Sequence, residues 1–198
     1  MKMRIIGTLI TILGLSVLWG QTDLCRPSVF KDGSIWKGSD VIEMFTLTNA
    51  SGMSIKVTNY AASLTDVSVP DRQGQFEHVV LGFDSLESYL ERHPKFGATI
   101  GRFANRIRNA EFSLNGQTYH LEKNNKEHSI HGGTNGFNRQ VFKTDTFYTV
   151  KDTAIVVFKY KSAHLEGGFP GNIELSIAYK LTNHNEIVLE YTATTDKP

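Results

Sequence analysis

The chain has 198 residues, 40% of them hydrophobic, and its 21 Lys and Arg against 20 Asp and Glu give a formal net charge of +1. A near-neutral charge without a basic run argues against nucleic acid or an anionic membrane surface as a partner. The length is sufficient for one domain with a sizeable core, and the frequent Phe, Tyr and β-branched residues favour strands.

The first 20 residues differ from the rest of the chain. A positive start, Met1-Lys2-Met3-Arg4, precedes an apolar run over residues 5–20 that is short for a membrane span. This pattern predicts a secretory signal peptide over residues 1–20, with an uncleaved N-terminal anchor as the alternative. We therefore expect an exported protein, periplasmic or extracellular, with no stable membrane insertion of its folded part.

Residues 21–40 are interpreted as a lead-in to the folded domain. They include Cys25, the only cysteine, so no internal disulfide can form. Its place just after the apolar run raises the idea of a lipid-modified N-terminus, although Leu24 is larger than the residue expected before a lipidated cysteine. Further on, Asn49-Ala50-Ser51 matches the acceptor pattern for N-glycosylation, which matters only in a eukaryotic host.

The first part of the domain is predicted to be a series of strands and turns. Met53, Ile55 and Val57 alternate on one face, which is typical of a half-buried strand. A turn is expected at residues 49–52, and residues 70–74 supply another, with a proline that fixes φ and a glycine that tolerates positive φ. The predicted strands are residues 41–47, 53–59, 64–69 and 76–83.

One short helix and one hairpin follow. The helix is expected to be capped by Asp84 and to end at Pro94. Three apolar residues share one of its faces, namely Leu86, Tyr89 and Leu90. The hairpin spans residues 111–121 and turns at Asn115-Gly116, a pair that readily adopts the positive φ values of a type I′ turn.

Strands dominate the last third of the chain, at residues 154–160, 173–181 and 187–193. The whole pattern predicts an all-β fold, a predominantly antiparallel β-sandwich. Pro198 follows the last strand almost at once, with no closing element. We therefore expect an unpaired edge or an uncovered apolar face, and a sandwich that is incomplete at its C-terminus.

Residues 101–108 contain the first candidate site. Arg102 and Arg106 are separated by an even number of positions, so both side chains point the same way if the segment is extended. Together with Asn105 they offer guanidinium and amide donors suited to sugar hydroxyls or carboxylates. The alternative is a solvated basic face.

The second candidate is His131-Gly132-Gly133, where a titratable ring lies beside backbone that can bend sharply and admit a ligand closely. A third segment, residues 164–171, carries His164 and Glu166 and is interpreted by itself as a connecting loop. The scattered histidines and single cysteine give no metal-ligand spacing, and no nucleotide or nucleophile motif occurs. Neither a metal nor an organic cofactor is therefore predicted.

Taken in order, these segments resemble the aldose 1-epimerase (galactose mutarotase) family over about residues 41–198. The most specific matches are GRFANRI at residues 101–107 and HGGTNGF at residues 131–137. Longer stretches also match, among them VTNYAASLTDVSVPDRQGQFEHVVLGFDSLESYL, NNKEHSIHGGTNGFNRQVF and EGGFPGNIELSIAYKL.

The resemblance implies a large antiparallel β-sandwich that binds a free hexose, such as glucose or galactose, in an open cleft. It implies that Asn105 and Arg106 contact the sugar and that His131 hydrogen-bonds near the ring oxygen and the anomeric centre. The family interconverts α and β anomers: a base takes the proton of the C1 hydroxyl, an acid protonates the ring oxygen, and the opened ring recloses on the other face. No cofactor is required, and a monomer is expected.

The chain departs from the family pattern at its end. The resemblance implies a second histidine, the principal acid, shortly beyond Pro198, and a glutamate, the base, much further on. Residues 41–198 are therefore expected to be the N-terminal part of an aldose 1-epimerase domain, with little or no mutarotase activity alone. The alternatives are a non-catalytic carbohydrate-binding β-sandwich and, given extra cations around the cleft, a hexose-phosphate epimerase.

Overall fold

The computed structural model of the chain describes residues 26–91 and 94–198. The predicted signal peptide over residues 1–20 and Cys25 lie outside the described residues, so what is expected of them stays a prediction. Within the described part, no helix is both long and apolar enough to cross a membrane.

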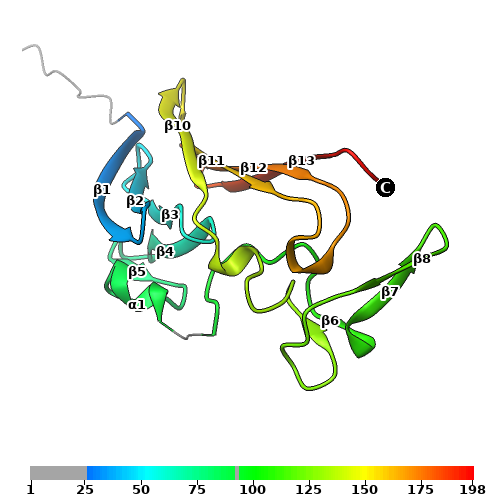
Figure 1. Cartoon of the computed structure of the whole chain (residues 1–198). Helices are drawn as coiled ribbons and strands as arrows, with labels where there is room; N and C mark the ends of the chain where they lie inside the picture. The colour runs from blue at the N-terminus through cyan, green and yellow to red at the C-terminus, as the bar shows by residue number, and fades with distance from the viewer. Residues whose placement is uncertain (1–25, 92–93) are drawn as a thin grey trace, which may run out of the picture.

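Most of the strand residues in the described chain belong to two antiparallel sheets (Figure 1). The first is a meander in chain order, composed of β1 (Ser28–Lys37), β2 (Asp40–Thr48), β3 (Ser54–Thr58), β4 (Ser63–Pro70) and β5 (Phe76–His78). The second is also a meander, composed of β10 (Lys143–Val150), β11 (Thr153–Ser162), β12 (Ile173–Thr182) and β13 (Ile187–Thr195). Short turns join most neighbouring strands, because antiparallel neighbours need no crossover connection, and a longer loop over residues 163–172 joins β11 to β12.

The inner faces of the two sheets meet in the main core. Phe45, Ile55 and Val57 of the first sheet belong to one buried cluster with seven residues of the second sheet, which are Ala154, Val156, Phe158, Leu175, Ile177, Tyr179 and Leu181. In β12 the buried residues recur at every second position, so one face is inside and the other outside. Two sheets that bury their apolar faces against each other form a β-sandwich, and the predicted fold class is confirmed.

A second, smaller cluster covers the outer face of the first sheet. Ile42 of β2 packs there against Tyr60 and against Tyr89 of α1 (Leu86–Leu90). The Phe83 ring meets the Tyr89 ring edge-on at 5.2 Å, and the Phe83 N–H donates to the Tyr89 hydroxyl (3.0 Å). The short helix is therefore held by its aromatic face, since five residues are too few for a helix to be stable alone.

The predicted helix cap is wrong. The cap is Ser85, whose backbone is extended (φ −134°, ψ 153°) and whose Oγ accepts from the Ser88 N–H at 3.4 Å. Asp84 precedes it and so lies one position too early to satisfy the free N–H groups of the first turn.

In the two large sheets, the strands agree with the predictions except in three places. The predicted strands at residues 41–47, 53–59, 64–69, 154–160, 173–181 and 187–193 are confirmed as β2, β3, β4, β11, β12 and β13. β1 and β10 were not predicted, because most of their side chains are exposed and show no clean alternation. The strand expected at residues 76–83 ends at His78, because the chain leaves the sheet to bring Phe83 onto Tyr89.

The chain between the two sheets holds short elements only. These are β6 (Arg106–Ile107), η1 (Arg108–Ala110), β7 (Glu111–Leu114), β8 (Gln117–His120), β9 (Ser129–Ile130) and η2 (Phe137–Arg139), and η3 (Glu166–Gly168) lies between β11 and β12. β7 and β8 form the predicted hairpin, with φ of 51° at Asn115 and 78° at Gly116. Ala110, Leu121 and Phe169 pack together at its base and fix it to the loop after β11.

Asn49 joins the turns at one end of the two sheets. Its side chain is 1% exposed, and its Nδ2 donates to the Thr182 carbonyl (2.9 Å) and to Oδ1 of Asn185 (2.7 Å). Its Oδ1 accepts from the N–H and the hydroxyl of Ser51. The acceptor nitrogen of the glycosylation pattern is thus buried and occupied in the folded chain.

One long edge of the second sheet is open. Leu189 and Tyr191 of β13 are directly opposite the core residues Tyr179 and Ile177 of β12, so they lie on the inner face of the sheet. Even so they are 40% and 52% exposed, and among the described residues no strand pairs with the far side of β13. The expected incompleteness of the sandwich on the C-terminal side is seen here (Figure 1).

Candidate sugar site

The short β6–β9 pair brings two candidate segments together. Arg106 in β6 is the register partner of Ile130 in β9, the residue before His131. The His131 N–H donates to the Asn105 carbonyl (2.9 Å), and the Asn105 N–H donates to Nδ1 of the His131 ring (3.0 Å). Asn105, Arg106 and His131 therefore lie at one place, although 26 positions separate Asn105 from His131.

The hydrogen bond from Asn105 fixes the tautomer of His131. Because Nδ1 accepts a hydrogen bond, the proton of the neutral ring resides on Nε2. The pKa of His131 is lowered, first by burial and then by the positive charges of Lys95 and Arg106. Near neutral pH, His131 is thus an uncharged imidazole whose Nε2–H can donate to a ligand oxygen.

Asn105 and Arg106 are both exposed beside the ring. Nη1 of Arg106 donates to Oδ1 of Asn105 at 3.2 Å, which orients the two side chains relative to each other. Asn105 has a left-handed backbone (φ 64°), a conformation that Asn adopts more readily than most residues. The pair presents guanidinium and amide donors of the kind that bind sugar hydroxyls.

Close backbone contact holds the residue 131–136 loop against the segment that carries Asn105. Gly132 has φ +83°, and a Cβ there would lie 1.8 Å from the Gly101 carbonyl oxygen. The ring of Phe137 covers Gly101, 2.1 Å from where a Cβ would lie, and the Phe137 N–H donates to the Gly101 carbonyl (3.2 Å). The glycines permit a close approach, as predicted, but the group that approaches Gly132 is the Gly101 backbone and not a ligand.

Arg102 and Arg106 do not act as a pair, and the expectation that they point the same way is wrong. Residues 101–105 form no strand and bend at Arg102, Phe103 and Asn105, and the positive φ of Asn105 turns the chain just before β6. The Arg102 guanidinium donates instead to Oγ of Ser162 (2.8 Å) and to the carbonyls of Ala163 (2.7 Å), Pro170 (2.8 Å) and Gly171 (2.9 Å). Burial lowers the pKa of Arg102, as expected of a cation drawn partly out of water.

The β11–β12 loop (residues 163–172) is a structural connection, as interpreted from the sequence. Glu166 accepts hydrogen bonds from the hydroxyls of Tyr160 and Ser162. Burial raises the pKa of Tyr160, and the Glu166 carboxylate raises it further. Nδ1 of His164 accepts from the Gly171 N–H (2.8 Å), so this histidine braces the loop from within.

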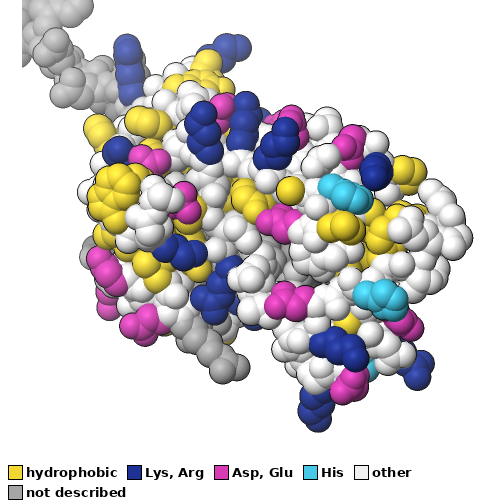
Figure 2. All heavy atoms as spheres, viewed as in Figure 1, with side chains coloured by type: hydrophobic (Ala, Val, Ile, Leu, Met, Phe, Trp, Pro, Cys, Tyr) yellow, Lys and Arg dark blue, Asp and Glu magenta, His cyan; other side chains and the backbone are white. Residues whose placement is uncertain are grey.

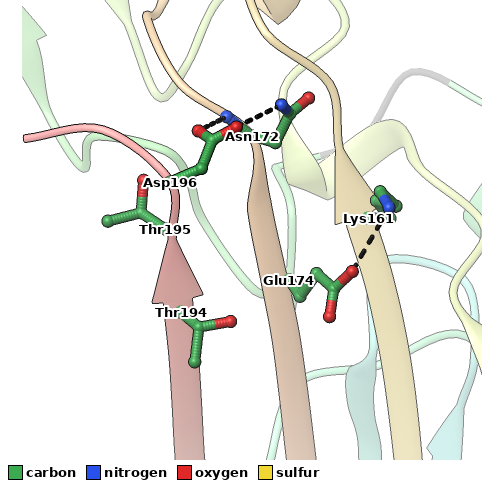
Figure 3. Close-up of a pocket in the computed structure, with 6 residues that line it drawn as sticks. All are labelled: Lys161, Asn172, Glu174, Thr194, Thr195 and Asp196. Atoms are coloured by element: carbon green, nitrogen blue, oxygen red, sulfur yellow. Dashed lines mark hydrogen bonds and ion pairs between the residues drawn. The ribbon is translucent and has the colours of Figure 1, made fainter.

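The chain after β13 closes on the same loop (Figure 3). Asp196 accepts from the side-chain amide and the backbone N–H of Asn172, at 2.6 Å each, and these bonds lower the pKa of Asp196. Lys161 and Glu174 form an ion pair at 3.2 Å on neighbouring strands, and with Thr194 they line an open hollow of about 380 Å³. The carboxylates of this hollow are already bound by donors of the chain itself.

Charge is mixed on the visible face of the molecule. On the face shown in Figure 2, Lys and Arg side chains are interspersed with Asp and Glu. In residues 26–91 and 94–198, no three His, Cys, Asp or Glu side chains gather as a metal ion would require.

Two residues that the sequence analysis did not single out hold the other side of the residue 131–136 loop. Nδ2 of Asn124 donates to the Ile130 carbonyl (2.9 Å), and its Oδ1 accepts from the Ile130 N–H (2.7 Å). Glu122 accepts from the Thr134 N–H at 2.7 Å. Asn124 begins the matching stretch NNKEHSIHGGTNGFNRQVF, but no spacing distinguishes it or Glu122 from the polar residues beside it.

A family model described as Aldose 1-epimerase matches residues 43–198. The chain belongs to the aldose 1-epimerase family. It is 35% identical over 161 residues to the galactose mutarotase of Mus musculus, a match that covers 81% of this chain and 45% of the mouse protein. It is 31% identical over 172 residues to the aldose 1-epimerase of Escherichia coli (strain K12), covering 87% of this chain and 47% of that protein.

The solved structures agree with this family. The galactose 1-epimerase from Lactobacillus acidophilus NCFM is similar to this chain with a TM-score of 0.76 and 28% identity, over 87% of this chain and 49% of that one. The predicted mutarotase-type fold and family are confirmed. The chain spans about half the length of the curated relatives it matches.

Proposed function

We propose that this chain is part of an aldose 1-epimerase that interconverts the α and β anomers of free hexoses such as glucose and galactose. The proposal rests mainly on one observation: hydrogen bonds hold Asn105, Arg106 and His131 together at the surface. Family membership supports the reaction class. The similar proteins named above, a galactose mutarotase and an aldose 1-epimerase, support a hexose as substrate.

Each side chain suits one part of the task. His131, uncharged and protonated on Nε2, donates a hydrogen bond at the ring oxygen or the anomeric centre and so favours charge that develops on oxygen. Arg106 and Asn105 donate to the neighbouring hydroxyls and orient the sugar. A hydrogen-bond donor does not remove the C1 hydroxyl proton, so anomerisation also requires a base and an acid besides these three residues.

Residues 1–198 alone are proposed to have little or no mutarotase activity, because the acid and base that the resemblance implies are not among them. Polarimetry of freshly dissolved α-glucose with the purified chain tests this, with heat-denatured chain as the control. The expected rate is the spontaneous one. Rapid anomerisation that heating abolishes would show that the described residues already hold a sufficient acid and base.

Sugar binding tests the site itself. Galactose is titrated into the chain by calorimetry, and Arg106→Met is expected to weaken binding about tenfold or more, as for loss of one charge-assisted hydrogen bond. Arg108→Met is the matched control, since Arg108 is also exposed, lies two positions away and carries the same charge. Equal binding by Arg106→Met and the unchanged chain would remove Arg106 from the site.

A non-catalytic carbohydrate-binding role is the second candidate. It is favoured by the described site itself, which offers donors from Asn105, Arg106 and the uncharged His131 but no carboxylate in the hydrogen bonds that join them. Galactose binding that stays fully intact in a longer form of the chain, with no turnover there, would support this role over the enzyme.

Export of the protein is proposed on residues 1–20 alone, because their positive start and apolar run are typical of a signal peptide. N-terminal sequencing of the protein recovered outside the cytosol checks it. A mature protein that still begins at Met1 in the cytosol would contradict it. The proposed exported form is a monomer, and light scattering of the purified protein checks its mass.

A further inference from the structure

Arg102 lies three positions before Asn105 but takes no part in the proposed contacts with sugar. We propose that Arg102 is a positioning residue, whose guanidinium holds the Asn105 N–H against Nδ1 of His131 and so keeps the His131 proton on Nε2. The role in sugar recognition rests on the proposed function. The role in fixing the tautomer does not.

The Arg102 clamp consists of Arg102 and its four acceptors, in Ser162, Ala163, Pro170 and Gly171. The acceptors belong to a firm part of the fold. Ser162 is fully buried at the end of β11, and its hydroxyl donates to Glu166. The loop is further braced by the His164–Gly171 bond and by Asn172 with Asp196 (Figure 3).

The segment from Arg102 to Arg106 is fixed at both ends. The clamp holds its first residue, and the β6–β9 pairing of Arg106 with Ile130 holds its last. Asn105 lies between these ends in a left-handed conformation, with both its N–H and its carbonyl bonded to His131. Without the Arg102 hydrogen bonds, one restraint on the strained backbone of Asn105 is lost. Asn105 can then relax to a lower-energy conformation, away from the His131 ring.

The chemistry of the clamp requires a guanidinium. Nε donates to the Ser162 hydroxyl and Nη2 to the Ala163 carbonyl, and Nη1 donates to two carbonyls, those of Pro170 and Gly171. A planar fork with donors in fixed directions can satisfy all four at once. A lysine ammonium is a compact point charge on a flexible stem, so it keeps the charge but not this geometry.

The consequence concerns which nitrogen of His131 meets the ligand as a donor. With the Asn105 N–H in place, Nδ1 is an acceptor and Nε2 carries the proton. Without it, the neutral ring is free to hold its proton on either nitrogen. The bond also favours the neutral ring, so its loss is expected to raise the pKa of His131.

Nitrogen NMR of the histidine side chains in the folded 198-residue chain tests the proposal. The His131 signals are identified by their loss in His131→Gln. The unchanged chain is expected to show His131 as a single Nε2–H tautomer. In Arg102→Met and Arg102→Lys, the neutral His131 ring is expected to populate both tautomers in exchange, and the titration midpoint of His131 is expected to shift to higher pH. Arg108→Met, which removes the same charge from a nearby exposed position, should change neither reading.

Ser162→Ala keeps the test decisive if Arg102→Met does not fold, because it removes a single acceptor of the clamp. It is expected to move the tautomer and the midpoint in the same direction but less. A folded Arg102→Met or Ser162→Ala with an unchanged His131 tautomer and midpoint would overturn the proposal. Full rescue by Arg102→Lys would also overturn it, since charge and not the fork would then position Asn105.

Adding galactose separates this proposal from the proposed function. If His131 changes tautomer in Arg102→Met but galactose leaves the Nε2 signal of the unchanged chain unmoved, the positioning role stands and the sugar site fails. If galactose moves the signal of the unchanged chain but Arg102→Met keeps the same His131 tautomer and midpoint, sugar recognition stands and the positioning role fails.

Discussion

Replacing Gly132 by alanine tests the close contact on which the candidate site is built. Gly132 has φ +83°, and an added Cβ would lie 1.8 Å from the Gly101 carbonyl oxygen and 2.9 Å from the Arg102 nitrogen. Both neighbours are backbone atoms, so neither can swing aside as a flexible side chain could. The loop of residues 131–136 must therefore move away from residues 101–105.

The expected loss of stability can be worked from these distances. Carbon and oxygen atoms rarely approach closer than about 3.3 Å, so the two segments must separate by about 1.5 Å. Overpacking of this kind costs about 1–3 kcal/mol, and a positive φ costs a residue with a Cβ about 1–2 kcal/mol more. The sum, about 2–5 kcal/mol, is a large part of the 5–15 kcal/mol that typically stabilises a domain.

Urea unfolding followed by circular dichroism measures the loss, and Gly116→Ala is the matched control. Gly116 also has a positive φ (+78°), but a Cβ there would meet no atom within 4 Å. Gly116→Ala should therefore lose only about 1–2 kcal/mol, for the backbone conformation alone. Equal losses in the two variants would mean that the contact between Gly132 and Gly101 costs nothing to break, and the reasoning would be refuted.

Three further outcomes are expected. The pKa of His131 is lower in the folded chain than in the unfolded chain, where it is about 6.5. The stability contributed by the neutral ring is therefore full above about pH 6.5 and is lost as the pH falls from there through the pKa of the folded state. His131→Gln should flatten this part of the profile of urea midpoints against pH. Asn49→Ala should lower the free energy of unfolding by about 2–3 kcal/mol, because it removes the hydrogen bonds that this buried side chain makes with Thr182, Asn185 and Ser51, and a variant as stable as the unchanged chain would contradict this. Ile177→Ala should cost about 2–5 kcal/mol as a fully buried core truncation, whereas Val188→Ala, on exposed surface of the next strand, should cost much less; similar urea midpoints for the two would contradict the assigned core.

Alternation in the sequence predicted the parts of the fold that are buried on one side only. Ile173 to Leu181 alternate without a break, and they form the strand whose inner face fills the core. β10 gives no such signal, because its side chains are almost all exposed and its apolar residues lie beside one another. Residues 143–150 form a strand because they pair with β11, and this pairing cannot be seen in their own sequence.

The residues of the candidate site were found through motifs, and the geometry between them was not. The even spacing of Arg102 and Arg106 predicts that their side chains point the same way only if the segment between them is extended. The positive φ of Asn105 bends that segment, so the prediction does not apply. The bond from the Asn105 N–H to the His131 ring joins positions that local patterns cannot relate. The same holds for the contacts of Arg102 with residues about 60 to 70 positions later.

The open edge of β13 bears on how this chain behaves when it is concentrated. Strands that pair side by side lie about 4.8 Å apart wherever the partner comes from, so a free edge with apolar residues on its inner face accepts a strand of another molecule as readily as one of its own. Glu190 cannot deter this, since it is paired with Lys180 across the β12–β13 ladder. We therefore expect folding within one chain, a first-order reaction, to compete with strand pairing between chains, a second-order reaction, so that dilution favours folding.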